Sequence, residues 1–160
     1  MLNEEIYPIA KFHIPGLKIL PHIKFLLKEK EQYPFAFYKD REIIEIYDAF
    51  PGAIWNGRTI LAGRPFLGIQ EINNIREQVE SLNIGFNLTW NNHLIDENDL
   101  NDKFCNLITE IFHNGKHSIT VGNDLILSYL KEKYPHFSYY QSIIQSANNK
   151  DFIPNNDYDI

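Results

Sequence analysis

Apolar, β-branched runs alternate with amphipathic stretches along most of this chain, and this alternation limits its fold more than any other feature. Strands are predicted in four segments: residues 43–50, 84–90, 117–121 and 136–144. Helices with one buried face are predicted in three segments, where apolar residues recur three and four positions apart: about 69–82, 98–113 and 125–133. The pattern predicts an α/β fold with a parallel sheet, in which the helices connect successive strands.

Turn and capping residues mark several boundaries of these elements. Asn114-Gly115 is a plausible end for the second helix, Asn123 or Asp124 can cap the third, and Pro135 ends it. The first 40 residues are less clear. We expect a short strand in KFHIPGL, a helix at about 21–32, and an edge segment in PFAFY.

The length of 160 residues fits a single α/β domain, 1–160. A complete β/α barrel needs about 250 residues, and the chain ends at Tyr158-Asp159-Ile160 as if another strand were beginning. One interpretation is therefore a partial, truncated barrel. The alternative is a small complete domain with a doubly wound sheet, to which the N-terminal segments add edge strands.

Composition excludes several classes of function. The formal charge of −6 and the scattered Lys and Arg residues argue against a nucleic-acid partner. The N-terminus lacks the pattern of a signal peptide or membrane span. The single cysteine, Cys105, cannot form an internal disulfide or hold a metal cluster alone, which favours a cytoplasmic protein. The six histidines form no metal motif, no phosphate-binding glycine motif follows a strand, and no cofactor is identified.

The order of these segments resembles the N-terminal half of the collagenase-like peptidases of unknown catalytic type. The similarity covers about residues 43–144, including the N-x-T-x-N-N segment from Asn87 and the run ITVGNDLILSYLKEKYPHFSYYQSI. In that TIM-type barrel family one strand ends in an Asp that opens a helix, the helix ends at Tyr-Pro, and the next strand ends in Ser. The corresponding residues here are Asp124, Tyr134-Pro135 and Ser142.

The resemblance implies a barrel-like scaffold, in a distant and uncharacterised branch, and no more. The family's later cysteines and its glutamate-containing motif have no counterpart in this chain, and the loop FPGAIWNGR differs from that of its best-known members. Peptidase activity is therefore not carried over.

The loop at residues 50–58 is the most unusual segment, because it follows a predicted strand at the edge where α/β proteins bind ligands. Arg58 could clamp a carboxylate or phosphate, Trp55 could stack on a ligand, and Asn56 lies between them. The structural alternative is a turn in which Trp55 fills the core and Arg58 pairs with a nearby acid.

Three further residues are candidates because they lie near the carboxyl ends of predicted strands. Asn91 shares the parity of Asn87 and Thr89, so these alternate positions could form a hydrogen-bonding wall inside a barrel. Asp124 and Ser142 follow the third and fourth strands, although Asp124 can equally serve as a helix cap.

These residues favour the N-terminal part of a β/α-barrel enzyme that binds a small polar or anionic ligand at the strand ends, with an unknown reaction. We hypothesise that the isolated chain is inactive. The competing hypothesis is a non-enzymatic binding or assembly module, whose open sheet edges pair with a second copy or with a complementary chain.

Overall fold

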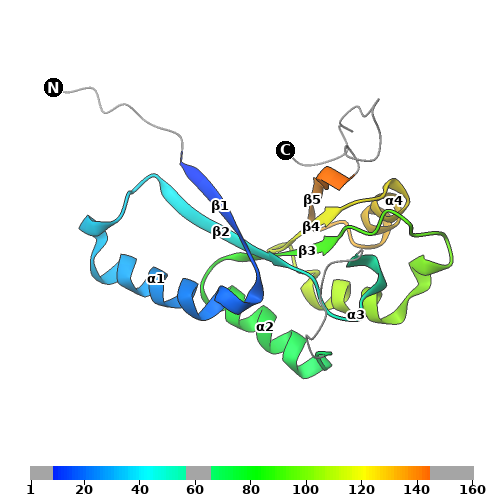
Figure 1. Ribbon diagram of the computed structural model, residues 1–160, viewed down its shortest axis with the longest axis horizontal. Helices are drawn as coiled ribbons and strands as arrows, with labels where there is room; N and C mark the ends of the chain where they lie inside the picture. The colour runs from blue at the N-terminus through cyan, green and yellow to red at the C-terminus, as the bar shows by residue number, and fades with distance from the viewer. Residues whose placement is uncertain (1–8, 57–65, 145–160) are drawn as a thin grey trace.

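Strands and helices alternate along the computed structural model of the protein, which describes residues 9–56 and 66–144 (Figure 1). The strands are β1 (Ala10–Pro15), β2 (Arg41–Asp48), β3 (Gly85–Trp90), β4 (Ser118–Val121) and β5 (Ser138–Gln141). The α-helices are α1 (Leu20–Gln32), α2 (Ile69–Ser81), α3 (Lys103–Phe112) and α4 (Asp124–Lys133). Short 3₁₀ turns are η1 (Leu17–Ile19), η2 (Pro34–Ala36), η3 (Ile54–Asn56) and η4 (Asp99–Asn101).

The five strands form one parallel sheet in the order β1-β2-β3-β4-β5. The predicted α/β class and the parallel sheet are therefore confirmed. Each strand lies beside its predecessor in the sequence, as the strands of a β/α barrel do. Among the five described strands the order never reverses, and such a reversal marks a doubly wound sheet.

Local sequence signals account for most element boundaries. Asp102 caps α3 by accepting a hydrogen bond from the backbone N–H of Cys105, at 2.7 Å. Asn123, rather than Asp124, caps α4 in the same way through the N–H of Leu125, at 2.7 Å. Both caps satisfy donors that a helix N-terminus leaves without intrahelical partners.

The prediction of an edge segment in PFAFY was wrong. Residues 34–36 form the turn η2, in which Phe35 is exposed to solvent. Pro34 lacks an N–H to donate to a sheet ladder and can open a helical turn, which explains the difference.

The two faces of the sheet differ sharply in polarity. Helices α1, α2 and α3 lie below the strands in Figure 1, and the residues that alternate toward the helices form the apolar core. Ile46, Phe86, Leu88, Ile119 and Val121 are fully buried there. The intervening positions of the same strands carry polar side chains on the other face, because successive strand residues point to opposite sides.

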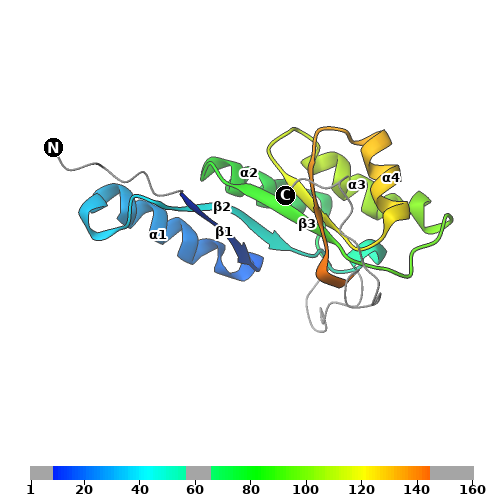
Figure 2. The same ribbon diagram turned by 90° about the horizontal axis from the view of Figure 1, so that it is seen from above.

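The sheet curls into a half-barrel with this polar face on the inside. In a flat sheet, the first and fifth strands would lie about 19 Å apart, four times the strand spacing of about 4.8 Å. Yet the rings of His13 on β1 and Tyr140 on β5 meet edge to face with their centroids 5.6 Å apart. The same curl is visible in Figure 2, where β5 passes over β3.

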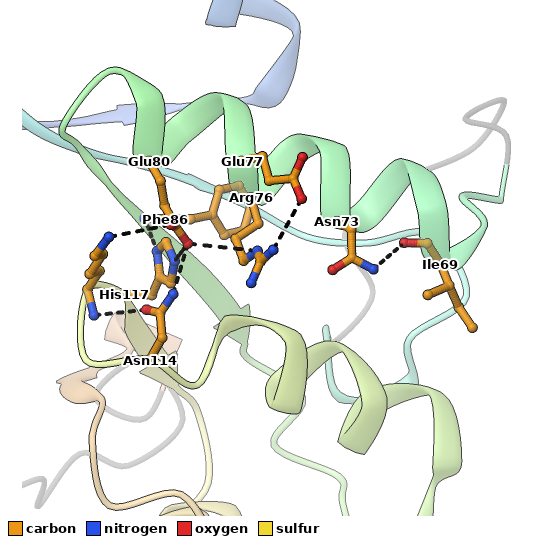
Figure 3. A network of polar contacts seen from close by, with 9 residues as sticks. Ile69, Asn73, Arg76, Glu77, Glu80, Phe86, Asn114 and His117 are labelled. Atoms are coloured by element: carbon orange, nitrogen blue, oxygen red, sulfur yellow. Dashed lines mark hydrogen bonds and ion pairs between the residues drawn. The ribbon is translucent and has the colours of Figure 1, made fainter.

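A network of polar contacts joins α2 to the amino ends of β3 and β4 (Figure 3). The side chain of His117 is fully buried, and its Nδ1 accepts a hydrogen bond of 3.0 Å from the N–H of Phe86. Its Nε2 therefore carries the proton and donates to Glu80 Oε1 at 3.2 Å. Asn114 Nδ2 also donates to this oxygen, at 2.8 Å, and Lys116 lies 3.5 Å from the other carboxylate oxygen.

This arrangement holds His117 in its neutral form. Burial lowers the pKa of His117 below its usual value, and it outweighs the opposite effect of the Glu80 carboxylate. Arg76 and Lys116 act in the same direction as burial. Burial of Glu80 raises the pKa of that carboxyl, but the hydrogen bonds from Asn114 and His117, together with the positive charge of Lys116, outweigh burial and leave the pKa below normal.

None of the helices in the described ranges is both long enough and apolar enough to cross a membrane.

The His117 network predicts that stability falls on mild acidification. The pKa of His117 is lower in the folded state than in the unfolded chain, so stability is full above about pH 6.5 and declines as the pH falls toward the folded value. We expect the titration of His117 to change the free energy of unfolding with a slope of at most about 1.4 kcal/mol per pH unit. Urea unfolding at pH 7 and at pH 5 measures the change.

His117→Asn is the matched variant, since its amide oxygen can still accept from the Phe86 N–H but does not titrate. We expect it to be less stable at pH 7 and to lose much of the slope, whereas the exposed-site variant His22→Asn keeps the slope. An unchanged slope in His117→Asn would contradict the assignment.

Candidate functional site

The polar inner face of the half-barrel encloses a hollow of about 330 Å³. Strands β1 to β5 all contribute to it, mainly through residues near their carboxyl ends. The lining residues are His13, Glu45, Tyr47, Asn87, Thr89, Asn91, Thr120, Tyr140, Ser142 and Ile143. Because the carboxyl ends of parallel strands are where barrels place their ligand sites, the hollow lies at the expected position for a site.

A chain of hydrogen bonds crosses the floor of the hollow from β1 to β4. His13 Nδ1 contacts Glu45 Oε1, and Ser118 Oγ lies 2.6 Å from Glu45 Oε2. Asn87 Nδ2 lies 2.7 Å from Ser118 Oγ, and Thr120 Oγ1 lies 2.8 Å from Asn87 Oδ1. Glu45, Asn87 and Ser118 are buried, so these contacts supply the partners that polar groups need away from water.

The Glu45 carboxylate determines which group donates in each of these hydrogen bonds. A carboxylate only accepts, so His13 and Ser118 both donate to it. Having donated its single proton, the Ser118 oxygen must accept from Asn87, which places the amide nitrogen of Asn87 toward Ser118. The Asn87 oxygen then faces Thr120 and accepts its hydroxyl proton.

Thr89 of β3 and Asn91, directly after β3, form a wall of the hollow next to this series of hydrogen bonds. Thr89 Oγ1 donates to the carbonyl oxygen of Asp48 at 3.0 Å. Asn91 Oδ1 is buried, and no donor from the described residues reaches it. The backbone of Asn91 lies tightly against Gly122, where an added Cβ would come within 2.5 Å of the Asn91 carbonyl oxygen. Glycine at position 122 therefore allows the ends of β3 and β4 to meet at this wall.

Of the six residues proposed from the sequence, the structure brings two together in the hollow. Asn91 and Ser142 both line it, at the ends of β3 and β5. The Ser142 N–H donates to the Val121 carbonyl at 2.8 Å, and its Oγ accepts from the Ile144 N–H at 3.3 Å. The first bond extends the pairing of β5 with β4, and the second is a local turn that fixes the serine side chain.

Trp55 and Asn56 lie in the core instead of the hollow. Trp55 is fully buried, packs edge to face on Trp90 and Tyr129, and donates its indole N–H to the Asp99 carbonyl at 2.9 Å. Asn56 is also buried, and its amide donates to the Phe50 carbonyl. The loop after β2 thus folds back over the core, as the structural alternative for Trp55 supposed.

Of the remaining two proposed residues, Asp124 does not line the hollow. Asp124 is exposed in the first turn of α4, where its carbonyl accepts from Ser128 Oγ at 3.0 Å. A carboxylate at this position interacts favourably with the helix dipole. Arg58 lies outside the described residues.

Sequence reasoning missed His13, Glu45, Ser118 and Tyr140 as site residues. The signal that could have found most of them is the one noted for Asn87, Thr89 and Asn91, namely polar residues at alternate strand positions. Glu45 and Tyr47 repeat that spacing in β2, and Ser118 and Thr120 repeat it in β4. His13 required knowledge of the register between β1 and β2, which places it opposite Glu45.

The described residues contain no cluster of three His, Cys, Asp or Glu side chains that could hold a metal ion. Cys105 is buried in α3, and burial raises the pKa of its thiol far above the usual value. This side chain behaves as a small apolar residue of the core, not as a nucleophile.

Comparison of the chain with protein-family models, with curated proteins and with solved structures found no match. The site must therefore be interpreted from its own geometry.

The position of Trp55 predicts a structural effect of its mutation. We expect Trp55→Ala to lower the free energy of unfolding by about 3–5 kcal/mol, because it leaves a large cavity. Trp55→Phe should cost less, since it keeps most of the packing but loses the hydrogen bond to Asp99. Guanidinium unfolding measures both, and a loss below 1 kcal/mol in Trp55→Ala, on the order of a surface substitution, would contradict the core assignment.

Proposed function

We propose that the protein binds a small polar molecule inside its half-barrel, in the hollow above Glu45 and Asn87. The main observation that supports this proposal is the series of hydrogen bonds on the inner face, which runs His13–Glu45–Ser118–Asn87–Thr120. Bulky aliphatic residues usually fill this layer of a β/α barrel. A polar inner face bordering an open hollow is suited to recognising a ligand by hydrogen bonds.

The chemistry of the lining supports this proposal. Glu45 and His13 are paired groups of the kind that can hold or move a proton. Both residues line the hollow, and the side chain of His13 is 38% exposed. Asn91 and Ser142 line the hollow and carry amide and hydroxyl groups. We assign no reaction to the site. The resemblance to collagenase-like peptidases contributes a barrel scaffold to the proposal and no activity.

A screen of the full chain by NMR tests the proposal. Amino acids, sugars, small amines and small carboxylates are added to ¹⁵N-labelled protein, and side-chain amide signals are followed. We expect at least one compound to shift the signals of Asn87 and Asn91 while leaving Asn106, on α3, unchanged.

Asn91→Phe adds bulk to the lining of the hollow and should abolish the ligand-induced shift of Asn87, the reporter signal that this variant retains. Ser128→Phe adds the same bulk on the exposed face of α4 and should retain the shifts. If no compound shifts Asn87 or Asn91, the proposed binding function is wrong.

A second candidate function, assembly with another copy of the chain, is favoured by an apolar groove on the outside of β1. The groove has a volume of about 320 Å³ and lies between α1, η2 and the first two strands. Phe12 and Leu26 line it and are 44% and 43% exposed. Exposed apolar surface of this kind commonly marks an interface.

The rim of this groove suits a symmetric contact. Lys30 and Arg41 line it together with Glu42, so both signs of charge border the same apolar surface. In a two-fold interface each patch meets its own copy, and a patch with both signs can then be self-complementary. Among the described residues β1 also pairs along one edge only, which leaves backbone groups available for association.

Assembly predicts a mass that rises with protein concentration toward that of a dimer in light scattering. Leu26→Glu introduces a charge into the groove and should shift the protein to monomer. Leu94→Glu changes an equally apolar but distant exposed residue and should leave the mass unchanged. A constant monomeric mass would exclude this second function.

A further inference from the structure

The hydroxyl groups of Thr89 and Thr120 face the hollow with their protons already donated inside the protein. Thr89 donates to the carbonyl of Asp48, and Thr120 donates to Asn87 Oδ1. A hydroxyl has one proton and two lone pairs, so what remains on each oxygen is acceptor capacity. The register of β3 and β4 pairs these residues directly, so the two acceptors lie side by side.

Asn91 adds a third acceptor two residues beyond Thr89, on the same side of the strand. Its Oδ1 is buried and has no donor among the described residues. A buried acceptor without a partner is unfavourable, because the hydrogen bond that it made to water in the unfolded chain is not replaced. A ligand that brings a donor to this position recovers the loss.

The charge of the lining also favours a ligand that donates hydrogen bonds and carries a positive charge. The lining contains the buried carboxylate of Glu45 and no Lys or Arg from the described residues. Among the described lining residues His13 is the only basic side chain, and it donates to Glu45. The aromatic residues Tyr47 and Tyr140 also line the hollow, and the face of an aromatic ring attracts cations.

We propose that the molecule bound in the hollow is a small protonated primary amine. This inference rests on the proposed function and specifies its ligand class. The ammonium group has three N–H donors and no acceptor, which complements the oxygens of Thr89, Thr120 and Asn91. The Glu45 carboxylate, which lines the same hollow, supplies a negative charge that favours a cation there. The earlier expectation of an anionic ligand depended on Arg58, which lies outside the described residues.

Three probes of equal chain length test the class of ligand: 4-amino-1-butanol, 1,4-butanediol and 4-hydroxybutyrate. They differ at one end, which is a cation, a neutral hydroxyl or an anion. Each is titrated into the ¹⁵N-labelled full chain at pH 7, and the side-chain amide signals of Asn87 and Asn91 report binding. We expect the amine to bind at least tenfold more tightly than either of the other probes.

Glu45→Gln removes the charge while nearly preserving shape. We expect it to weaken binding of the amine about tenfold and to abolish its advantage over the diol. Glu132→Gln removes an exposed carboxylate on α4 and should leave all three affinities unchanged. If Glu45→Gln does not fold, Thr89→Val, which removes one of the three acceptors, provides the comparison and should weaken amine binding selectively.

Each result is decisive for the ligand class. Equal binding of the diol and the amine at Asn87 and Asn91 would overturn the amine assignment and leave the proposed binding function intact. Preference for 4-hydroxybutyrate would show that the hollow favours an anion. It would overturn the amine assignment and leave the proposed binding function intact. Absence of shifts with all three probes would also overturn the amine inference, while the broader screen decides separately whether the hollow binds any other molecule.

Discussion

The polar interior depends on the hydrogen bonds that the buried Glu45 carboxylate accepts. This carboxylate accepts hydrogen bonds from His13 on β1 and from Ser118 on β4, so one side chain of β2 ties together strands on both sides of it. Ser118 lies two strands away, which in a flat sheet is about 10 Å. The 2.6 Å contact between Ser118 Oγ and Glu45 Oε2 links β2 to β4 across β3, on the inner face of the curled sheet that borders the hollow.

The two faces of the sheet are stabilised by different interactions. On the helix side, Phe86 and Leu88 are buried with apolar neighbours, and the hydrophobic effect supplies most of the driving force for folding. On the inner side, Asn87 is equally buried but makes directed hydrogen bonds. Adjacent residues of one strand thus have different tasks, since their side chains point to opposite faces.

Most of the fold was predictable because its signals are local. The helix period in 69–82 corresponds to α2, and the β-branched runs at 43–50 and 84–90 correspond to β2 and β3. The edge segment in PFAFY failed because aromatic residues favour strands while Pro34 began a 3₁₀ turn. The site was predicted less well. Asn91 and Ser142 do line one hollow. Trp55 was expected at a ligand because its loop has a composition typical of binding loops, but its side chain packs in the core.

The sequence by itself determined which residues share a face, because a strand alternates with a period of two and a helix with a period of 3.6. It thereby placed Asn87, Thr89 and Asn91 on one side of β3. Only the tertiary structure decided that this side lies inside a curved sheet and that His13 of β1 meets Tyr140 of β5. Curvature and register arise from contacts between distant segments, and no local period records which strand comes to lie opposite another.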